Sequence, residues 1–209
     1  MYIQVFLVGL LAAMSPGPDF FIVMKNSLDF GSRTGIATAI GIALALVIHI
    51  TYTILGFTVI LQKYPAVFII IQLLGAAYLI WLGWNAIRST SKETNEITED
   101  LKNEKISKNL FQAFKEGFLC NVLNPKSALF FLSIFSQFIS TNTPDWIRWV
   151  YGVEIIFAVG LWFVVLATII SYGKFRLFYR RYSFWFDRFL GTVIILFALK
   201  IIFSVVKST

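Results

Sequence analysis

The chain has 209 residues, of which 58% are hydrophobic and 14% are charged, and its mean hydropathy is +0.77. In soluble domains roughly a quarter of the residues are charged, so the composition excludes an ordinary soluble enzyme or binding module. The formal net charge of +7 would suit a nucleic-acid partner. A basic surplus is also typical of the loops that flank membrane spans, and we expect no nucleic-acid partner.

Apolar runs of about 20 residues recur along the whole chain, and each is long enough to cross a hydrocarbon core of about 30 Å. The runs are continuous rather than alternating, which argues against a membrane β-barrel. We therefore predict an all-α integral membrane protein with six transmembrane helices. The predicted spans are 3–24, 35–61, 66–87, 118–139, 146–172 and 184–206.

The first run is interrupted by SPGP at 15–18, which is followed at once by Asp19. A proline inside a helix removes a hydrogen-bond donor and clashes with the preceding turn, at a cost of about 3 kcal/mol or more. The prolines on both sides of Gly17 therefore predict that this helix opens near its middle. Opened backbone groups cannot face lipid, so they face protein or a watery cavity, where helix ends can hold a charged ligand. A kink that only shapes packing is the alternative.

The second and third runs contain further candidates. His49, the sole histidine, can titrate near neutral pH, which suits proton coupling, although a lone membrane histidine is more often an interhelical hydrogen-bonding residue. Tyr78 in the third run is a candidate for lining a central cavity. Glycines are expected at close helix contacts, since small residues let membrane helices approach each other. They are Gly41, Gly56, Gly75, Gly83, Gly160 and Gly191.

Residues 89–109 are the one plainly hydrophilic stretch, and we expect a solvated linker there, partly helical or disordered. The linker separates two halves, 1–88 and 110–209, with three predicted spans each. SPGPDFFIV at 15–23 is echoed by LNPKSALFF at 123–131, and LLGAAYLIWLGW at 73–84 by FLGTVIILFALK at 189–200. These echoes match Pro18 to Pro125 and Gly75 to Gly191. Copies of a unit with an odd number of spans cross the membrane in opposite senses, so we predict two inverted three-helix repeats.

The fourth run is interrupted like the first, by Asn121, Asn124 and Pro125. Broken spans at matching positions of two halves are the best sequence indication of a transporter's binding site. Lys126 follows Pro125 as Asp19 follows its own proline. The two charges are expected either to pair or to bind the carboxylate and ammonium groups of a zwitterion. The alternative for both residues is that their charged ends reach the membrane surface.

Glu154 in the fifth run is the other buried acid. It is a candidate proton carrier or a partner of Lys200 or His49, and the alternative is a hydrated residue near the outer end of its span. Cys120 is the only cysteine, so we predict neither an internal disulfide nor a thiol relay. One histidine leaves no metal cluster of familiar spacing, and no cofactor is predicted.

Basic residues gather on one side of the predicted membrane, which is the signature of cytoplasmic loops. The connections after the first, third and fifth runs carry Lys25, Arg33, Arg88, Lys92, Lys102, Lys105, Lys108, Lys115, Lys174, Arg176, Arg180, Arg181 and Arg188. The opposite side carries only Lys63, Arg148 and Lys207. Both termini are therefore predicted outside the cytoplasm. The first run has no basic residue before it, unlike a secretory signal, and is predicted to be a retained span.

Four segments together resemble the LysE/RhtB family of bacterial amino-acid exporters. They are SPGPDFFIV at 15–23, GSRTGIATAIGIALALVIH at 31–49, LLGAAYLIWLGW at 73–84 and EGFLCNVLNPKSALFFLSIFSQFI at 116–139. The resemblance extends over nearly the full length and is less distinctive in the C-terminal part. It implies six spans in the bacterial cytoplasmic membrane and proton-driven efflux of amino acids or derivatives such as threonine, homoserine, homoserine lactone or lysine. The threonine/homoserine branch is the closer one.

We therefore expect a transporter and not an enzyme, with an amino acid and protons as partners and the lipid bilayer as its environment. An intramembrane enzyme or a membrane assembly protein without transport activity is the alternative, and a homodimer stays open. The candidate cargo-binding residues are Ser15, Pro16, Gly17, Pro18, Asp19, Tyr78, Asn121, Asn124, Pro125 and Lys126. The candidate proton-coupling residues are Asp19, His49 and Glu154.

Overall fold

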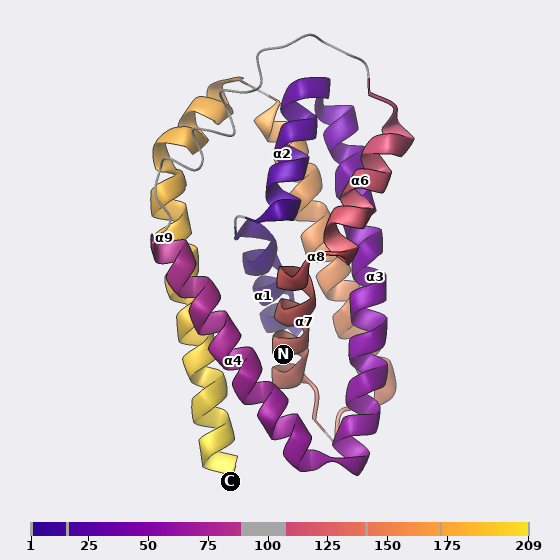
Figure 1. Ribbon diagram of the computed structural model, residues 1–209, viewed down its shortest axis with the longest axis vertical. Coiled ribbons are helices and arrows are strands. Elements are labelled where there is room, and N and C mark those ends of the chain that lie inside the picture. The colour runs from indigo at the N-terminus through magenta and orange to yellow at the C-terminus, as the bar shows by residue number, and fades with distance from the viewer. Residues whose placement is uncertain (1, 16, 89–107, 141, 172, 209) are drawn as a thin grey trace.

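The computed structural model describes residues 2–15, 17–88, 108–140, 142–171 and 173–208, and within these ranges all regular structure is helical. Figure 1 shows most of the helices running along the long axis of the molecule. They are α1 (Tyr2–Met14), α2 (Pro18–Phe30), α3 (Ser32–Lys63), α4 (Pro65–Arg88), α6 (Leu110–Val122), α7 (Pro125–Phe138), α8 (Asp145–Ile170) and α9 (Gly173–Ser208).

Helix length and hydropathy confirm that the chain is a multi-pass helical membrane protein. Among the described helices, four contain a segment long and apolar enough to cross a membrane: Ser32–Phe57, Ala66–Arg88, Asp145–Ile170 and Arg188–Lys207. The helices α6 and α7, which are bent by 57° at their junction, make a fifth crossing if they are taken together. The helices α1 and α2 have 13 residues each. At about 1.5 Å per residue, neither is long enough to cross a core of about 30 Å alone.

Both predicted interruptions are present. Helix α1 ends at Met14 and α2 begins at Pro18, while α6 ends at Val122 and α7 begins at Pro125. Each proline lies in the first turn of its helix, where a missing N–H breaks no intrahelical bond. In Figure 1, α2 and α6 extend from the breaks toward one end of the molecule, and α1 and α7 extend toward the other end. The two breaks therefore lie at a similar depth.

Several predicted boundaries differ from the structure. Helix α6 begins at Leu110 rather than at 118, because Asn109 caps it by accepting a 2.9 Å hydrogen bond from the N–H of Phe111. Helix α9 begins at Gly173 rather than at 184, since no glycine or proline between 174 and 190 interrupts it. Lys108 and Asn109 at the end of the predicted linker are thus ordered, and the rest of the linker, 89–107, lies outside the described residues.

Helix α3 lies along one side of the bundle in Figure 1 and packs against α2, α6 and α8. Its contact with α6 depends on two glycines. A Cβ on Gly41 would collide with the carbonyl oxygen of Phe114, and a Cβ on Gly117 would collide with that of Thr38. Close backbone approach of this kind supplies van der Waals contact where lipid removes the hydrophobic driving force between helices. The expected packing role is confirmed for Gly41.

Helices α4 and α9 pack on each other, and α4 also packs on α7. Gly83 and Gly191 face each other, since a Cβ on either glycine would lie 2.6 Å or 2.5 Å from the carbonyl oxygen of the other. A Cβ on Gly75 would instead lie 2.6 Å from Oγ of Ser133 in α7, so the matched pair Gly75 and Gly191 occupies two different contacts. Near the Cβ position of Gly56, no atom of another helix in the described ranges lies within 4 Å, so the expected helix contact is wrong for this glycine.

Candidate functional site

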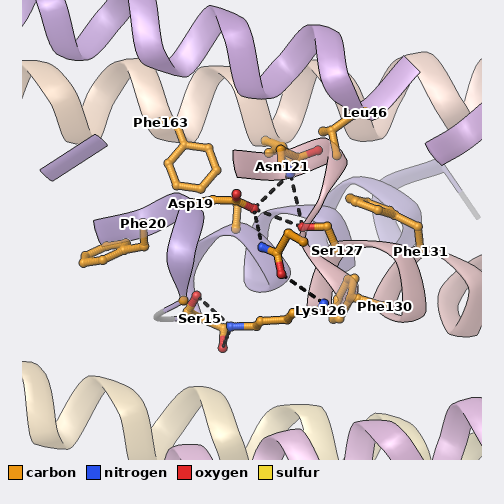
Figure 2. Close-up of a pocket in the computed structure, with 14 residues that line it drawn as sticks. Ser15, Asp19, Phe20, Leu46, Asn121, Lys126, Ser127, Phe130, Phe131 and Phe163 are labelled. Atoms are coloured by element: carbon orange, nitrogen blue, oxygen red, sulfur yellow. Dashed lines mark hydrogen bonds between the residues drawn. The ribbon is translucent and has the colours of Figure 1, made fainter. Parts of the chain in front are cut away.

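The two helix breaks enclose a cavity of about 40 Å³. This volume has room for about three water molecules, at about 10–15 Å³ of water-centre space for each. Figure 2 shows polar groups of both breaks pointing toward one another, with aromatic rings on either side. The polar wall consists of Ser15, Gly17, Asp19, Asn121, Asn124, Lys126 and Ser127. The apolar wall consists of Ala13, Phe20, Leu46, Phe130, Phe131, Val159 and Phe163.

Asp19 supplies a buried carboxylate to this cavity, and the residue is only 9% exposed. It lies in the first turn of α2, so the positive end of the helix dipole favours its charge. Its Oδ2 accepts hydrogen bonds from Asn121 Nδ2 at 2.9 Å, Asn124 Nδ2 at 3.1 Å and Ser127 Oγ at 3.0 Å (Figure 2). All three donors belong to the second break. One carboxylate oxygen of the first break is therefore held by the opposite half of the chain.

Two buried acceptors in the wall have no partner among the described residues: Oδ1 of Asp19 and Oδ1 of Asn121. A buried polar atom without a hydrogen bond costs about 1–3 kcal/mol. Two such atoms on one small cavity mark a place that fits hydrogen-bond donors from outside the chain. Water or a ligand with several N–H groups would satisfy both.

Lys126 carries the positive charge of the cavity toward the first break. Its Nζ donates to the carbonyl oxygen of Ser15 at 3.2 Å and to the Ser15 hydroxyl at 3.1 Å (Figure 2). Ser15 follows the last residue of α1, and the negative end of that helix dipole favours an ammonium group. Gly17 leaves room for the amine, because a Cβ there would lie 2.9 Å from Nζ.

The hydrogen bonds described above join Asp19 and Lys126 to polar groups of the opposite break rather than to each other. Ion pairs formed elsewhere in the described residues include Lys108 with Glu116 and Arg148 with Asp145. Asp19 is bonded to polar groups of the second break, and Lys126 to polar groups of the first. Each charge is thus held by the break that does not carry it.

His49 lies behind the cavity wall. Its Nε2 is 2.9 Å from the backbone carbonyl oxygen of Asn121, and its Nδ1 is 2.7 Å from the hydroxyl of Tyr52. A carbonyl oxygen can only accept, so Nε2 carries the proton in this contact. The same oxygen also accepts from the N–H of Asn124 at 3.0 Å. The geometry corresponds to the alternative predicted for His49, a histidine that hydrogen-bonds between helices and here holds the end of α6.

Three other predicted cargo-binding residues are not among the residues that line the cavity. Pro18 and Pro125 are exposed and begin α2 and α7, so they shape the breaks without lining the cavity. Tyr78 on α4 is also not among the lining residues, and its ring lies 5.7 Å from that of Trp81 on the same helix. Pro16 lies outside the described residues.

Glu154 is also separate from the cavity. It precedes the wall residue Val159 by five positions on α8, which corresponds to about 7.5 Å along the helix axis. Its buried Oε2 has no hydrogen-bond partner among the described residues. Neither predicted partner meets it, because both ring nitrogens of His49 are bonded elsewhere and Lys200 is exposed on α9.

Two polar features were not predicted. Ser127 bonds Asp19 from within a motif in which only its neighbours were singled out. The second feature is a cluster around Asn26, whose Nδ2 donates to Thr38 Oγ1 at 2.8 Å and to Glu116 Oε2 at 3.3 Å. Lys108 donates to Asn26 Oδ1 at 3.0 Å and pairs with Glu116. The sequence signal was an asparagine directly after the first apolar run, since a buried amide needs partners.

The family model of the LysE type translocator matches residues 10–205. The threonine efflux protein of Escherichia coli K12 is 28% identical over 204 residues, which cover 98% of each chain. An uncharacterised membrane protein of the same strain, YahN, is 30% identical over 190 residues, covering 91% of this chain and 83% of that protein. Another, YrhP of Bacillus subtilis, is 30% identical over 197 residues, covering 92% and 94%. No solved structure matches. The chain therefore belongs to the LysE type translocator family.

Proposed function

We propose that the protein exports small amino acids or derivatives, such as threonine, homoserine or homoserine lactone, and that the cavity between the breaks binds them. One observation carries this proposal. The buried Asp19 carboxylate has one oxygen held by three donors and the other without a partner among the described residues, at the point where two helices are interrupted. The threonine efflux protein that aligns with 98% of this chain supports an amino-acid cargo.

The proposed arrangement has six crossings in the bacterial cytoplasmic membrane, with α1 and α2 as one interrupted crossing and α6 and α7 as another. The basic residues on the connections 25–34, 88–117 and 173–188 support a cytoplasmic position for these connections and an external position for both termini. The cargo then enters from the end of the bundle to which α2 and α6 extend.

Two inverted repeats, 1–88 and 110–209, complete this arrangement. Pro18 and Pro125 each begin a helix after a break, and the glycine that meets Gly191 is Gly83 rather than Gly75, the glycine matched to Gly191 in the sequence. The offset between Gly83 and Gly191 is close to that between the two prolines. Residues that are equivalent in two inverted repeats are expected to meet where the pseudo-twofold axis passes between helices. Movement of one repeat against the other would expose the cavity to the two sides of the membrane in turn.

In the proposed mechanism, the cargo and a proton use the Asp19 carboxylate alternately. The cargo's ammonium group neutralises the carboxylate on the way out, and a proton from outside neutralises it on the way back. A bare buried carboxylate is costly in a membrane, so this exchange couples export to proton entry. Among the three predicted proton-coupling residues, Asp19 is preferred to His49 and Glu154 because the other two lie outside the cavity wall.

Replacement of Asp19 by Asn tests this function in liposomes that contain the purified protein. The amide preserves the shape of the side chain but removes its charge, and it turns a donor toward a site that needs acceptors. We expect the wild type to show counterflow of at least one compound in a panel of labelled amino acids, with dependence on a pH gradient. We expect Asp19→Asn to reduce counterflow to the level of empty liposomes while inserting into the membrane normally.

Wild-type transport by Asp19→Asn would remove this carboxylate from the mechanism. A folded wild-type protein that transports no compound of the panel would favour the other classes, an assembly protein or an intramembrane enzyme. The geometry gives the enzyme little support, because the ring nitrogens of His49 bond a tyrosine hydroxyl and a backbone carbonyl rather than a serine or cysteine nucleophile.

A further inference from the structure

One end of the cavity carries two buried acceptor oxygens without a geometric hydrogen-bond partner among the described residues. Asp19 and Asn121 are 9% and 1% exposed, and each contributes one buried oxygen without a partner among the described residues. The donors around them are already used, since Asn121 Nδ2 bonds both Asp19 Oδ2 and Ser127 Oγ, at 2.9 Å and 3.1 Å. A ligand group at this end must therefore donate hydrogen bonds, and a positive charge on that group would be attracted to the negative charge of the carboxylate. A primary ammonium group has these properties.

The opposite end of the cavity is cationic. Lys126 extends its amine past Gly17 to the backbone oxygen and hydroxyl of Ser15, and all three residues belong to the cavity wall. These contacts are made to neutral oxygens at 3.1–3.2 Å, which are weaker partners for an ammonium group than a carboxylate is. An anionic ligand group can replace the Ser15 hydroxyl without moving the lysine far.

The rest of the wall offers nothing to a further charge. Beyond the two ends, the side chains that line the cavity are aliphatic or aromatic, among them Phe20, Phe130, Phe131 and Phe163. A charged cargo side chain would lose its water here without gaining a partner.

We propose that the cavity binds both ionic groups of its cargo separately, the ammonium group at Asp19 and Asn121 and the carboxylate at Lys126 and Ser15. The inference rests on the proposed export function and narrows its cargo. The protein then requires a zwitterionic α-amino acid with a small uncharged side chain. It discriminates against a lactone, which has no free carboxylate, and against a dibasic amino acid.

Three matched compounds test this assignment in liposomes that contain the full-length protein: threonine, 1-amino-2-propanol, which lacks the carboxylate, and 3-hydroxybutyrate, which lacks the ammonium group. Each compound is measured as a competitor of labelled-threonine counterflow. In the wild type, threonine should compete at least about tenfold better than either fragment, since each lost group removes a charge-assisted hydrogen bond. In Lys126→Met, the threonine KM should rise by about tenfold or more, while competition by 1-amino-2-propanol relative to threonine should improve by a similar factor.

The conservative variant Lys126→Arg keeps the charge and serves as the control for folding, with the unfolding midpoint of each purified variant measured in detergent. If Lys126→Met does not fold, Ser15→Ala combined with Gly17→Ala supplies a second perturbation of the cationic end, with the same expected loss of preference. Equal competition by threonine and 1-amino-2-propanol in the wild type would overturn this inference alone. Equal weakening of threonine and 1-amino-2-propanol by Lys126→Met would do the same. Absence of any amino-acid counterflow in the wild type would overturn the export function, and this inference with it.

Discussion

At the break at 123–124, a residue of the break itself supplies the side-chain hydrogen bond to a helix end. At the break at 15–17, the side chain that bonds a helix end comes from the other half of the chain. Asn124 caps α7 through Oδ1, which accepts from the N–H of Lys126 at 3.0 Å. The corresponding cap of α2 is Gly17, which has no side chain to offer. The amine of Lys126 instead bonds Ser15 at the end of α1. The second break therefore has a side-chain cap of its own, whereas the first break receives its side-chain contact from Lys126 of the other half.

This asymmetry suggests a division of labour between the breaks. The second break presents three donors to Asp19, and two of them, Asn124 and Ser127, also accept a hydrogen bond of their own, which limits the freedom of their side chains. At the first break, two of the contacts of Lys126 go to neutral oxygens of Ser15, at 3.1 Å and 3.2 Å, and a carboxylate is a stronger partner for an ammonium group than these oxygens are. We expect changes at the second break to affect both folding and transport, and changes at the first break to affect mainly transport.

The largest effect is expected from Asn124→Ala, which removes hydrogen bonds at the second break. The change removes the cap of α7 and a hydrogen bond to the buried Asp19 carboxylate. Together these should lower the free energy of unfolding by about 2–4 kcal/mol and reduce counterflow to background. The measurements are unfolding of the purified protein in detergent and transport in liposomes.

The chain offers a matched control for this variant. Asn109 caps α6 with the same geometry, accepting from the N–H of Phe111 at 2.9 Å, but it is exposed and bonds no other break. Asn109→Ala should therefore cost about 1 kcal/mol and leave counterflow unchanged. If the two alanine variants lose the same stability and the same transport, the contact between Asn124 and Asp19 contributes nothing.

The breaks themselves could be predicted from the sequence because proline acts locally. Pro18 and Pro125 stop a helix whatever surrounds them, and the polar residues beside them had to face something other than lipid. The membrane class follows from apolar runs that need no partner to be recognised. The start of α6 was missed because residues 110–117 are too polar to belong to an apolar run, although the cap at Asn109 begins a helix there.

The hydrogen bonds of the site could not be predicted in the same way. The donors to Asp19 are more than 100 residues away along the chain, and so is the acceptor of Lys126. The echo between the halves suggested that Asp19 and Lys126 lie close together. Which neutral group lies nearest to each charge depends on how the helices are rotated about their own axes, and the sequence does not show this. The position of Tyr78 depends on rotation in the same way, because an almost uniformly apolar helix does not reveal which of its faces meets the breaks, and Tyr78 is not among the residues that line the cavity.

A smaller effect is expected from Gly17→Ala, which changes the contact of Lys126 with the first break. The backbone of Gly17 is extended, with φ near −179°, so alanine introduces no backbone strain. Its Cβ would lie 2.9 Å from Nζ of Lys126 and 3.2 Å from Cδ, and the flexible end of the lysine must move away. We expect a rise of about threefold to tenfold in the KM for threonine, equivalent to about 0.7–1.4 kcal/mol, with little change in the unfolding midpoint.

Gly56→Ala is the control at an uncrowded glycine, because no atom of another described helix lies within 4 Å of its Cβ position. Alanine inside α3 should stabilise the helix by about 0.5–1 kcal/mol and leave the KM unchanged. A KM that rises as much in Gly56→Ala as in Gly17→Ala would show that the lysine contact does not matter for binding.

The smallest effect is expected from Ser15→Ala, because the serine offers the lysine two oxygens and the change removes only one. The hydroxyl at 3.1 Å from Nζ is lost, and the backbone carbonyl at 3.2 Å remains. Hydrogen bonds between membrane helices average about 0.6 kcal/mol, so the KM for threonine should change by less than about threefold. Thr168→Val removes an exposed hydroxyl that bonds only the carbonyl of Val164 in its own helix, and it should change nothing. In Ser15→Ala, Lys126 can still bond the backbone carbonyl oxygen of residue 15. A loss of transport as complete as in Asn124→Ala would therefore contradict the expected difference between the two breaks.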